Sequence, residues 1–133
     1  MNLNIPYMET DNKLLNDAYR IAAGDIVGNI VYYQNGLLTE AKPCMIAGLD
    51  YNTPWTRDTA INIWNALSIL SPEVSKNTLL AVLEEEEGNI YIGGQYWDSI
   101  IWMIGAREYC RFHKDDNFYR LAFEAGRNSV HRL

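Results

Sequence analysis

Two helical segments that are apolar on nearly every side constrain the fold of this 133-residue chain more than any other feature. The first spans residues 57–70 and the second 96–112, and large aliphatic or aromatic residues fall on most faces of both. A helix that is apolar nearly all round is buried rather than laid on a surface. Because domains cluster near ~100–150 residues, we expect residues 1–133 to form a single domain around these two helices.

The two segments also repeat one pattern. Residues 55–66, WTRDTAINIWNA, align with residues 95–106, QYWDSIIWMIGA, forty positions later. Each buried helix is followed by a tight turn and then by an amphipathic helix, over about 73–86 in the first unit and 118–130 in the second. A period of ~40 residues with paired helices is typical of a curved array of α-hairpins, so we expect a mainly α fold.

Shorter segments are expected around this array. A helix over about 10–23 is ended by Gly24, a natural C-terminal stop. The glutamates at 84–87 lie at the C-terminus of the 73–86 helix, where the helix dipole disfavours negative charge, so we expect fraying there. Residues 89–92, which glycines bracket, are expected to form a short extended loop.

A small sheet is expected ahead of the first buried helix. Residues 25–33 are rich in β-branched and aromatic types, and Asn35-Gly36 is the strongest short signal for a β-hairpin. Residues 37–39 would form the return strand, and 44–46 a further extended piece. The sequence therefore predicts a small antiparallel β insertion near residues 26–46.

Charge and composition exclude several classes of function. The chain carries 17 acidic and 11 basic residues, for a net charge of −6, and no run of Lys or Arg. Neither a nucleic acid nor an anionic membrane surface is therefore an expected partner. No apolar run reaches the ~20 residues of a membrane-spanning helix. The first seven residues lack the build of a signal peptide, so a cytoplasmic location is expected if Met1 is the native start.

The sequence carries no motif for a metal or an organic cofactor. Cys44 and Cys110 are 66 positions apart with no CxxC, His113 has no ligand partner at metal spacing, and His131 lies near the C-terminus of the sequence. No P-loop, GxGxxG or GxSxG motif occurs. We therefore expect no metal site and no cofactor.

The loops are expected to bring the starts of both buried helices to one face. The turns that leave these helices are short, whereas the loops that lead into them, 24–54 and 87–95, are long. Both helix N-termini should then point to the same side of the molecule. That face gathers the candidate site residues Trp55, Arg57, Asp58, Tyr96, Trp97 and Asp98.

These residue types suit carbohydrate recognition. Sugars present apolar C–H faces, which aromatic rings cover, and hydroxyls, which Asp and Arg bind through charge-assisted hydrogen bonds. Trp55, Arg57 and Asp58 supply both functions within four residues. The alternative, commoner for such residues, is that Trp55 packs in the core while Asp58 caps its helix and pairs with Arg57.

The segment 51–66, YNTPWTRDTAINIWNA, closely resembles the W-T-R-D segment of the six-hairpin glycosidases, the (α/α)6 toroids that include glucoamylase-like and debranching-type enzymes. Residues 93–102, GGQYWDSIIW, are similar to the start of a following inner helix in that superfamily. The resemblance covers about 43–131 and implies hydrolysis of an O-glycosidic bond without a cofactor. It also implies that Arg57 and Asp58 bind sugar hydroxyls, with Trp55 at the same subsite and the Trp97-Asp98 pair beside them.

The chain is shorter than the enzymes it resembles. A closed toroid of six hairpins at ~40 residues each needs more than roughly two hundred residues, so 1–133 is expected to be an incomplete (α/α)6 catalytic domain. In these enzymes the general acid and the general base are carboxylates on later segments. Inverting hydrolysis needs two, ~6.5–9.5 Å apart. Asp98 is the one candidate for a catalytic carboxylate in the chain, and a helix cap or a sugar ligand is the commoner fate of such an aspartate.

Three functions are therefore open on the sequence. The first is a glycoside hydrolase, or a truncated part of one, that acts on a carbohydrate. The second is a non-catalytic truncated helical domain that binds carbohydrate or self-associates as a homo-oligomer, because an open array leaves apolar edges for a partner to cover. The third is a free-standing helical repeat module with no sugar site.

Overall fold

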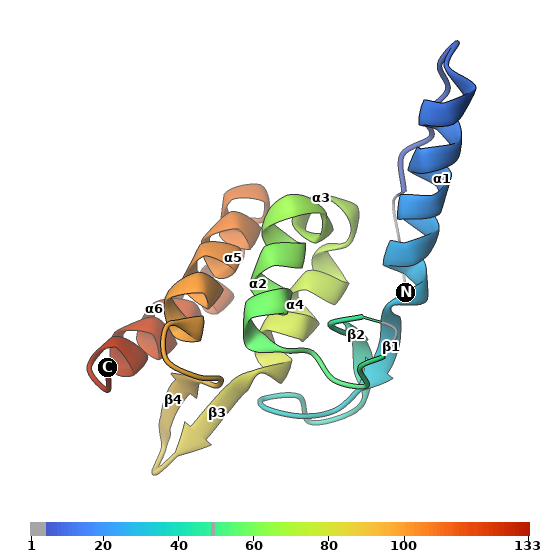
Figure 1. Cartoon of the computed structure of the whole chain (residues 1–133). Helices are drawn as coiled ribbons and strands as arrows, with labels where there is room; N and C mark the ends of the chain where they lie inside the picture. Colours follow the sequence, from blue (N-terminus) through green and yellow to red (C-terminus); the bar gives the residue numbers. More distant parts are fainter. Residues whose placement is uncertain (1–4, 49) are drawn as a thin grey trace.

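The computed structural model describes residues 5–48 and 50–133 and has a mainly α fold with small antiparallel β-hairpins (Figure 1). Helices α2, η1 and α3 form one helical run beside α5, and α4 and α6 lie behind these two (Figure 1). The expected succession of helix, tight turn and second helix is confirmed in both units. In chain order the elements are α1 Lys13–Gly28, β1 Ile30–Tyr33, β2 Lys42–Met45, α2 Thr56–Asn62, the π-helical turn η1 Ile63–Leu67, α3 Ser68–Leu70, α4 Pro72–Ala81, β3 Leu83–Glu86, β4 Asn89–Ile92, α5 Asp98–Phe112 and α6 Asp116–Val130.

The core lies where α2, α4, α5 and α6 meet. Trp102 of α5 is fully buried and packs in one cluster with Leu79 and Phe118. Its indole N–H donates to the carbonyl of Leu79 at 3.3 Å, so the polar end of this large side chain is satisfied. Helices α2 and α5 pack closely at Gly105, where a Cβ atom would lie 2.7 Å from the Cα of Ala60.

The two inner helices are buried on one side only. Ile61 and Trp64 on the first run, and Ile100 and Ile104 on α5, are exposed. The prediction that these helices are enclosed on nearly every side is therefore wrong for the described part of the chain. Within the described residues, these helices are covered on the side of α4 and α6, and large apolar side chains on their other side are exposed.

Helix α1 is longer than predicted. The side chain of Asn12 caps it by accepting from the Leu15 N–H, and the helix continues through Gly24 to Gly28. Gly24 is therefore not a stop, and residues 25–28 are helical rather than part of a strand. A glycine inside a helix lowers its stability by about 1 kcal/mol relative to alanine, but it ends the helix only where it adopts the left-handed conformation with a positive φ.

The first hairpin forms within the predicted insertion but uses a different return strand. Strand β1 pairs antiparallel with β2, so residues 37–39 are not paired with it. Residues 37–39 instead pack the segment between β1 and β2 against the C-terminal end of α4. The N–H of Leu37 donates to the carbonyl of Leu80 at 3.1 Å, and Leu38 is buried. Contacts to a distant helix outweigh the local signal of Asn35-Gly36.

A second hairpin replaces the predicted end of the helix over 73–86. Helix α4 ends at Ala81, and β3 carries the glutamates 84–86 antiparallel to β4. Glu87 and Gly88 have positive φ values of 51° and 77°, the conformation of a two-residue type I′ turn. The strand moves the negative charges away from the C-terminus of α4, where the helix dipole disfavours them. The extended conformation predicted for 89–92 is confirmed.

Asp115 connects three helices at the far end of the core. Its Oδ1 caps α6 by accepting from the Phe118 N–H at 3.0 Å, and its Oδ2 accepts from Lys76 Nζ at 2.6 Å and from the Tyr109 hydroxyl at 3.4 Å. The hydrogen bond from Lys76 is the main reason that the pKa of Asp115 lies below its usual range. Burial, followed by the negative charge of Asp115, raises the pKa of Tyr109 to about 12.

The raised pKa of Tyr109 predicts a loss of stability at high pH. The unfolded chain has a tyrosine pKa of ~10, so the contribution of Tyr109 is complete below pH 10 and is lost as the pH rises from about 10 to about 12. We expect the difference in free energy of unfolding between the protein and Tyr109→Phe to be constant from about pH 6, where Asp115 is ionised in the folded and the unfolded chain, to about pH 10, and to shrink above it. Urea unfolding at a series of pH values measures it. A difference that stays constant to pH 12 would contradict the prediction.

Candidate functional site

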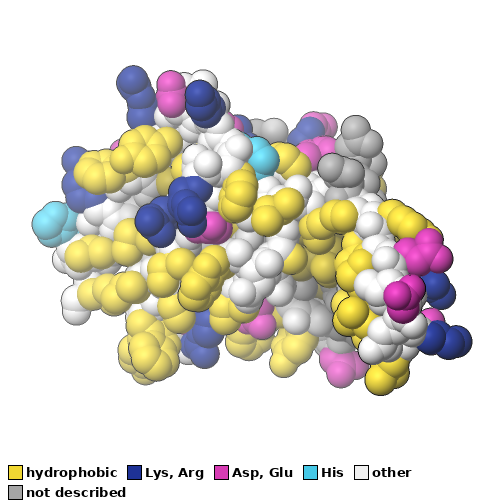
Figure 2. Space-filling model, turned by 90° about the horizontal axis from the view of Figure 1, so that it is seen from above, with side chains coloured by type: hydrophobic (Ala, Val, Ile, Leu, Met, Phe, Trp, Pro, Cys, Tyr) yellow, Lys and Arg dark blue, Asp and Glu magenta, His cyan; other side chains and the backbone are white. Residues whose placement is uncertain are grey.

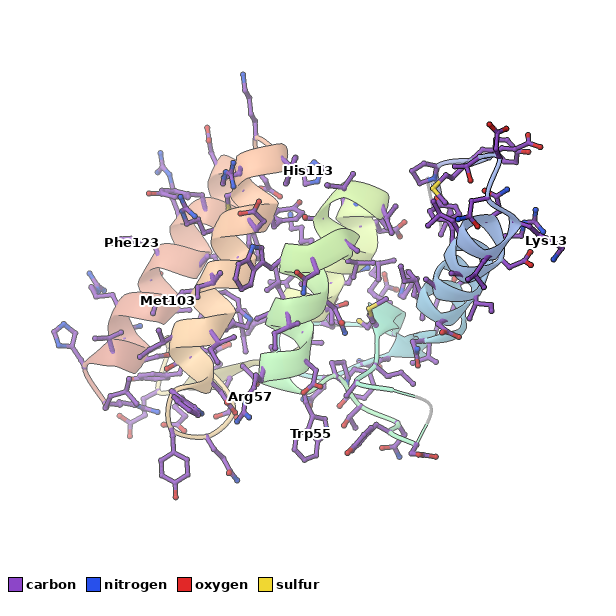
Figure 3. The ribbon with its side chains drawn as sticks, turned by 45° about the horizontal axis from the view of Figure 1, so that its top comes forward. Lys13, Trp55, Arg57, Met103, His113 and Phe123 are labelled. Atoms are coloured by element: carbon purple, nitrogen blue, oxygen red, sulfur yellow. The ribbon has the colours of Figure 1, made fainter. Side chains whose placement is uncertain are left out.

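The N-termini of α2 and α5 lie together, as the loop lengths predict. Arg57, in the first turn of α2, donates from Nε and Nη2 to Oδ1 of Asp98, in the first turn of α5, at 3.1 and 3.0 Å. Trp55 and Arg57 both project from this end of the helices (Figure 3). The pairs Arg57-Asp58 and Trp97-Asp98, forty residues apart in sequence, are therefore at one face of the molecule.

The loop before α5 holds Asp98 from its other side. Oδ2 of Asp98 accepts from the N–H of Gln95 at 3.0 Å, and the hydroxyl of Thr56 donates to the carbonyl of Gly93 at 2.9 Å. Gly94 fits between these groups because it has no side chain. Its φ is +108°, and a Cβ atom there would lie 2.9 Å from Thr56 Oγ1 and 3.0 Å from Asp98 Oδ2. The Asp98 carboxylate is thus fixed by both helices and the loop.

A cleft of about 500 Å³ opens between the approach to α2 and the loop before α5. Trp55 is 56% exposed, so it is not a core residue, and its ring meets that of Tyr51 edge-on at 5.5 Å between centroids. These two rings form an aromatic wall next to the Arg57–Asp98 pair. The cleft is lined by Tyr33, Ala47, Tyr51, Thr53, Pro54, Trp55, Thr56, Arg57, Asp58, Gly94, Gln95 and Asp98.

Asp58 is an uncommitted carboxylate in this cleft. It lies in the first turn of α2, but the N-cap residue is Trp55, and no side chain caps this helix. Arg57 pairs with Asp98 instead of Asp58, so the alternative of a capping Asp58 paired with Arg57 is wrong. Within residues 5–48 and 50–133, Asp58 has no hydrogen-bond or ion-pair partner.

Tyr96 and Trp97 lie beside the cleft rather than in its wall. The Cζ atom of Arg57 is 5.9 Å from the centroid of the Trp97 ring, a cation–π distance. Tyr96 lines a separate pocket of about 200 Å³ that also contains Glu84 and Arg132. Tyr96 and Trp97 are therefore not among the residues that line the cleft; Tyr96, with a left-handed φ of 47°, precedes α5, which begins at Asp98.

The sequence analysis missed the contribution of residues outside the repeated motif. Tyr33 reaches the cleft from β1, and Gln95 and Gly94 reach it from the loop before α5. The glycine pair 93–94 was a signal for a close backbone approach. Nothing in the local sequence of Tyr33 shows that β1 ends at this cleft.

The cleft offers polar recognition around a charged pair. Arg57 spends two donors on Asp98 and retains three of the five N–H groups of a guanidinium. Asp58 offers acceptors, and Tyr51 and Trp55 offer apolar faces. Among the described residues, no three His, Cys, Asp or Glu side chains are grouped as metal ligands. None of the described helices combines the length and the hydropathy that crossing a bilayer requires.

Comparison with known proteins adds no assignment: no family model, no curated protein and no solved structure matches this chain.

Proposed function

We propose that the cleft binds a carbohydrate and that this chain forms the sugar-holding part of a glycoside hydrolase. The observation that carries the proposal is the joining of Arg57, Asp58 and an exposed Trp55 in one cleft, with Asp98 fixing the guanidinium. The aromatic wall can pack against the apolar faces of a sugar, and the charged groups of Arg57 and Asp58 can bind its hydroxyls. The W-T-R-D resemblance assigns the same residues to the same task.

The roles within the cleft follow from the contacts. Asp98 has both carboxylate oxygens engaged, by Arg57 and by the Gln95 N–H, which favours a positioning role over that of a general acid or base. Asp58 is free to accept from sugar hydroxyls. Arg57, oriented by Asp98, donates to them. Trp55 and Tyr51 pack against the ring.

Hydrolysis requires more than this cleft holds. A glycosidase uses two carboxylates, one as acid and one as base or nucleophile. The acidic residues that line the cleft are Asp58 and Asp98, and Asp98 is paired with Arg57. We therefore expect residues 1–133 to bind sugar without hydrolysing its glycosidic bond. In this proposal the helical array is the first part of an (α/α)6 toroid.

Titration calorimetry with a panel of α-linked glucosides and mannosides tests the proposal. Because a hydrogen bond to a charged group contributes about 1.5–3 kcal/mol, Arg57→Ala is expected to weaken the binding of a ligand from the panel at least about tenfold. Trp55→Ala is expected to weaken it similarly, because the ring loses its contact with the sugar. Product analysis on the same mixtures is expected to show no hydrolysis.

Trp64→Ala is the matched control. Trp64 is 54% exposed, close to the 56% of Trp55, but it lies outside the cleft. Its replacement is expected to leave sugar affinity unchanged. The proposal fails if no sugar of the panel binds, or if Trp64→Ala weakens binding as much as Trp55→Ala does. Hydrolysis that Asp58→Asn abolishes would instead make Asp58 a catalytic residue.

A further inference from the structure

Helix α1 presents an apolar face that no described residue covers. The helix stands apart from the others and meets them mainly at its C-terminal end, where Ile26 packs on the core (Figure 1). Residues 5–12 run back along a different side, where the Thr10 N–H donates to Oδ1 of Asn16 at 2.9 Å. Spacings of three and four residues place the exposed apolar positions on one face: Leu14, Leu15, Ala18, Ile21 and Ala22.

A second apolar surface lies at the opposite edge of the molecule, between α5 and α6. It is a groove of about 160 Å³, with Met103 and Cys110 on one side and Tyr119 and Phe123 on the other. Phe123 is 65% exposed and Tyr119 59%. Seen from above, hydrophobic side chains gather over this edge with Lys and Arg side chains among them (Figure 2). A clustered, exposed apolar surface of this kind marks an interaction site.

Helix α1 is long enough to cover the groove. Helix α1 has 16 residues, and α5 and α6 have 15 each. At 1.5 Å per residue these helices are about 24 and 22 Å long. The part of α5 that lines the groove runs from Trp102 to Cys110, about 12 Å, so α1 is long enough to span it.

The two surfaces also match in charge. Arg107 lines the groove, and Arg120 and Arg127 are on α6; none of the three has an acidic partner among the described residues. On α1, Asp25 comes four residues after Ile21 and three after Ala22, so it shares their face. Asp25 likewise has no ion-pair partner in the part of the chain that the structure covers. Asp25, at the C-terminal end of this α1 face, thus has a charge opposite to that of Arg107 in the groove and of Arg120 and Arg127 on α6.

We propose that α1 of one copy of this chain docks in the α5/α6 groove of a second copy. The contact is head-to-tail, because α1 lies at the opposite edge of the molecule from α5 and α6, which carry the groove (Figure 1). Each pair then keeps one free α1 and one free groove, so assembly continues into a ring or an open chain. The partner surface on α1 is apolar from Leu14 to Ala22 and acidic at Asp25, near its C-terminal end, and it is independent of the sugar cleft.

Mass measurement in solution, by light scattering or sedimentation over a wide range of protein concentration, tests this contact. The full chain is expected to form assemblies that grow with concentration and weaken at high salt, because salt screens the Asp–Arg attraction. Ile21→Glu, on α1, and Phe123→Glu, in the groove, are each expected to give a monomer. Tyr32→Glu is the matched control, since Tyr32 is also exposed but lies on β1, and it is expected to assemble normally.

Mixing the two variants makes the test specific. Ile21→Glu keeps an intact groove and Phe123→Glu keeps an intact α1, so the mixture is expected to form a one-to-one dimer and nothing larger. Formation of that dimer also proves that both variants are folded. A chain that stays monomeric at every concentration overturns the proposal, as does assembly that survives both substitutions. Loss of vesicle binding in Ile21→Glu, with the parent chain monomeric, would assign the face to lipid instead.

Discussion

Replacing Trp102 by alanine is expected to lower the free energy of unfolding by about 3–5 kcal/mol, the range found when a buried Phe or Trp is removed from a core. Trp102 is fully buried between α4, α5 and α6, its ring is 6.4 Å from that of Phe118, and its N–H is bonded to the Leu79 carbonyl. The substitution therefore leaves a cavity and an unpaired carbonyl. Against a typical total of about 5–15 kcal/mol, this is a large fraction.

Urea unfolding followed by circular dichroism measures this loss, because the signal does not depend on tryptophan. Trp64→Ala is the control, since this residue has the same chemistry but is 54% exposed on η1. It is expected to cost about 1 kcal/mol or less. If the two alanine variants were equally stable, Trp102 would not be the centre of the core.

Replacing Gly36 by alanine is expected to lower the free energy of unfolding by about 2–5 kcal/mol. The φ of +59° at this position costs a residue with a Cβ about 1–2 kcal/mol. In addition, the new Cβ would lie 2.5 to 2.7 Å from the backbone carbonyl oxygens of Leu80, Ala81 and Leu83. Backbone atoms at the end of α4 cannot move aside as a flexible side chain can, so overpacking adds about 1–3 kcal/mol.

Gly24→Ala is the matched control for Gly36→Ala. Gly24 lies inside α1, and a Cβ there would meet nothing within 4 Å. The substitution is expected to raise the helical signal in circular dichroism and to leave stability unchanged or higher by up to about 1 kcal/mol. A Gly36→Ala variant as stable as Gly24→Ala would show that the connection over 34–41 does not pack against the C-terminal end of α4.

The sequence predicts the helical frame well because burial repeats at the helical period. The run from 57 to 70 and the helix that ends at Phe112 are found where the apolar pattern places them. The errors occur where local signals compete with distant contacts. Glycine is a residue type that often ends helices, but Gly24 lies inside α1 and does not end it. The Asn35-Gly36 turn leads the chain to the end of α4 rather than into an adjacent strand.

The candidate site was predicted in part. The motif places Trp55, Arg57 and Asp58 correctly in one cleft, and the loop lengths place Asp98 beside them. The pairing of Arg57 with Asp98 rather than with its neighbour Asp58 could not be predicted, because it depends on the angle at which α2 crosses α5. The left-handed conformation of Tyr96 ahead of α5 is likewise not encoded in the helical pattern.

The bridge between Arg57 and Asp98 also couples recognition to the cohesion of the whole molecule. Its two ends belong to different hairpin units, 41 positions apart along the chain. A ligand that touches both units binds the folded form alone. At a ligand concentration of a hundred times the dissociation constant, binding would add about 2.7 kcal/mol to the free energy of unfolding of the protein. A rise in melting temperature on adding a sugar would therefore report ligand binding.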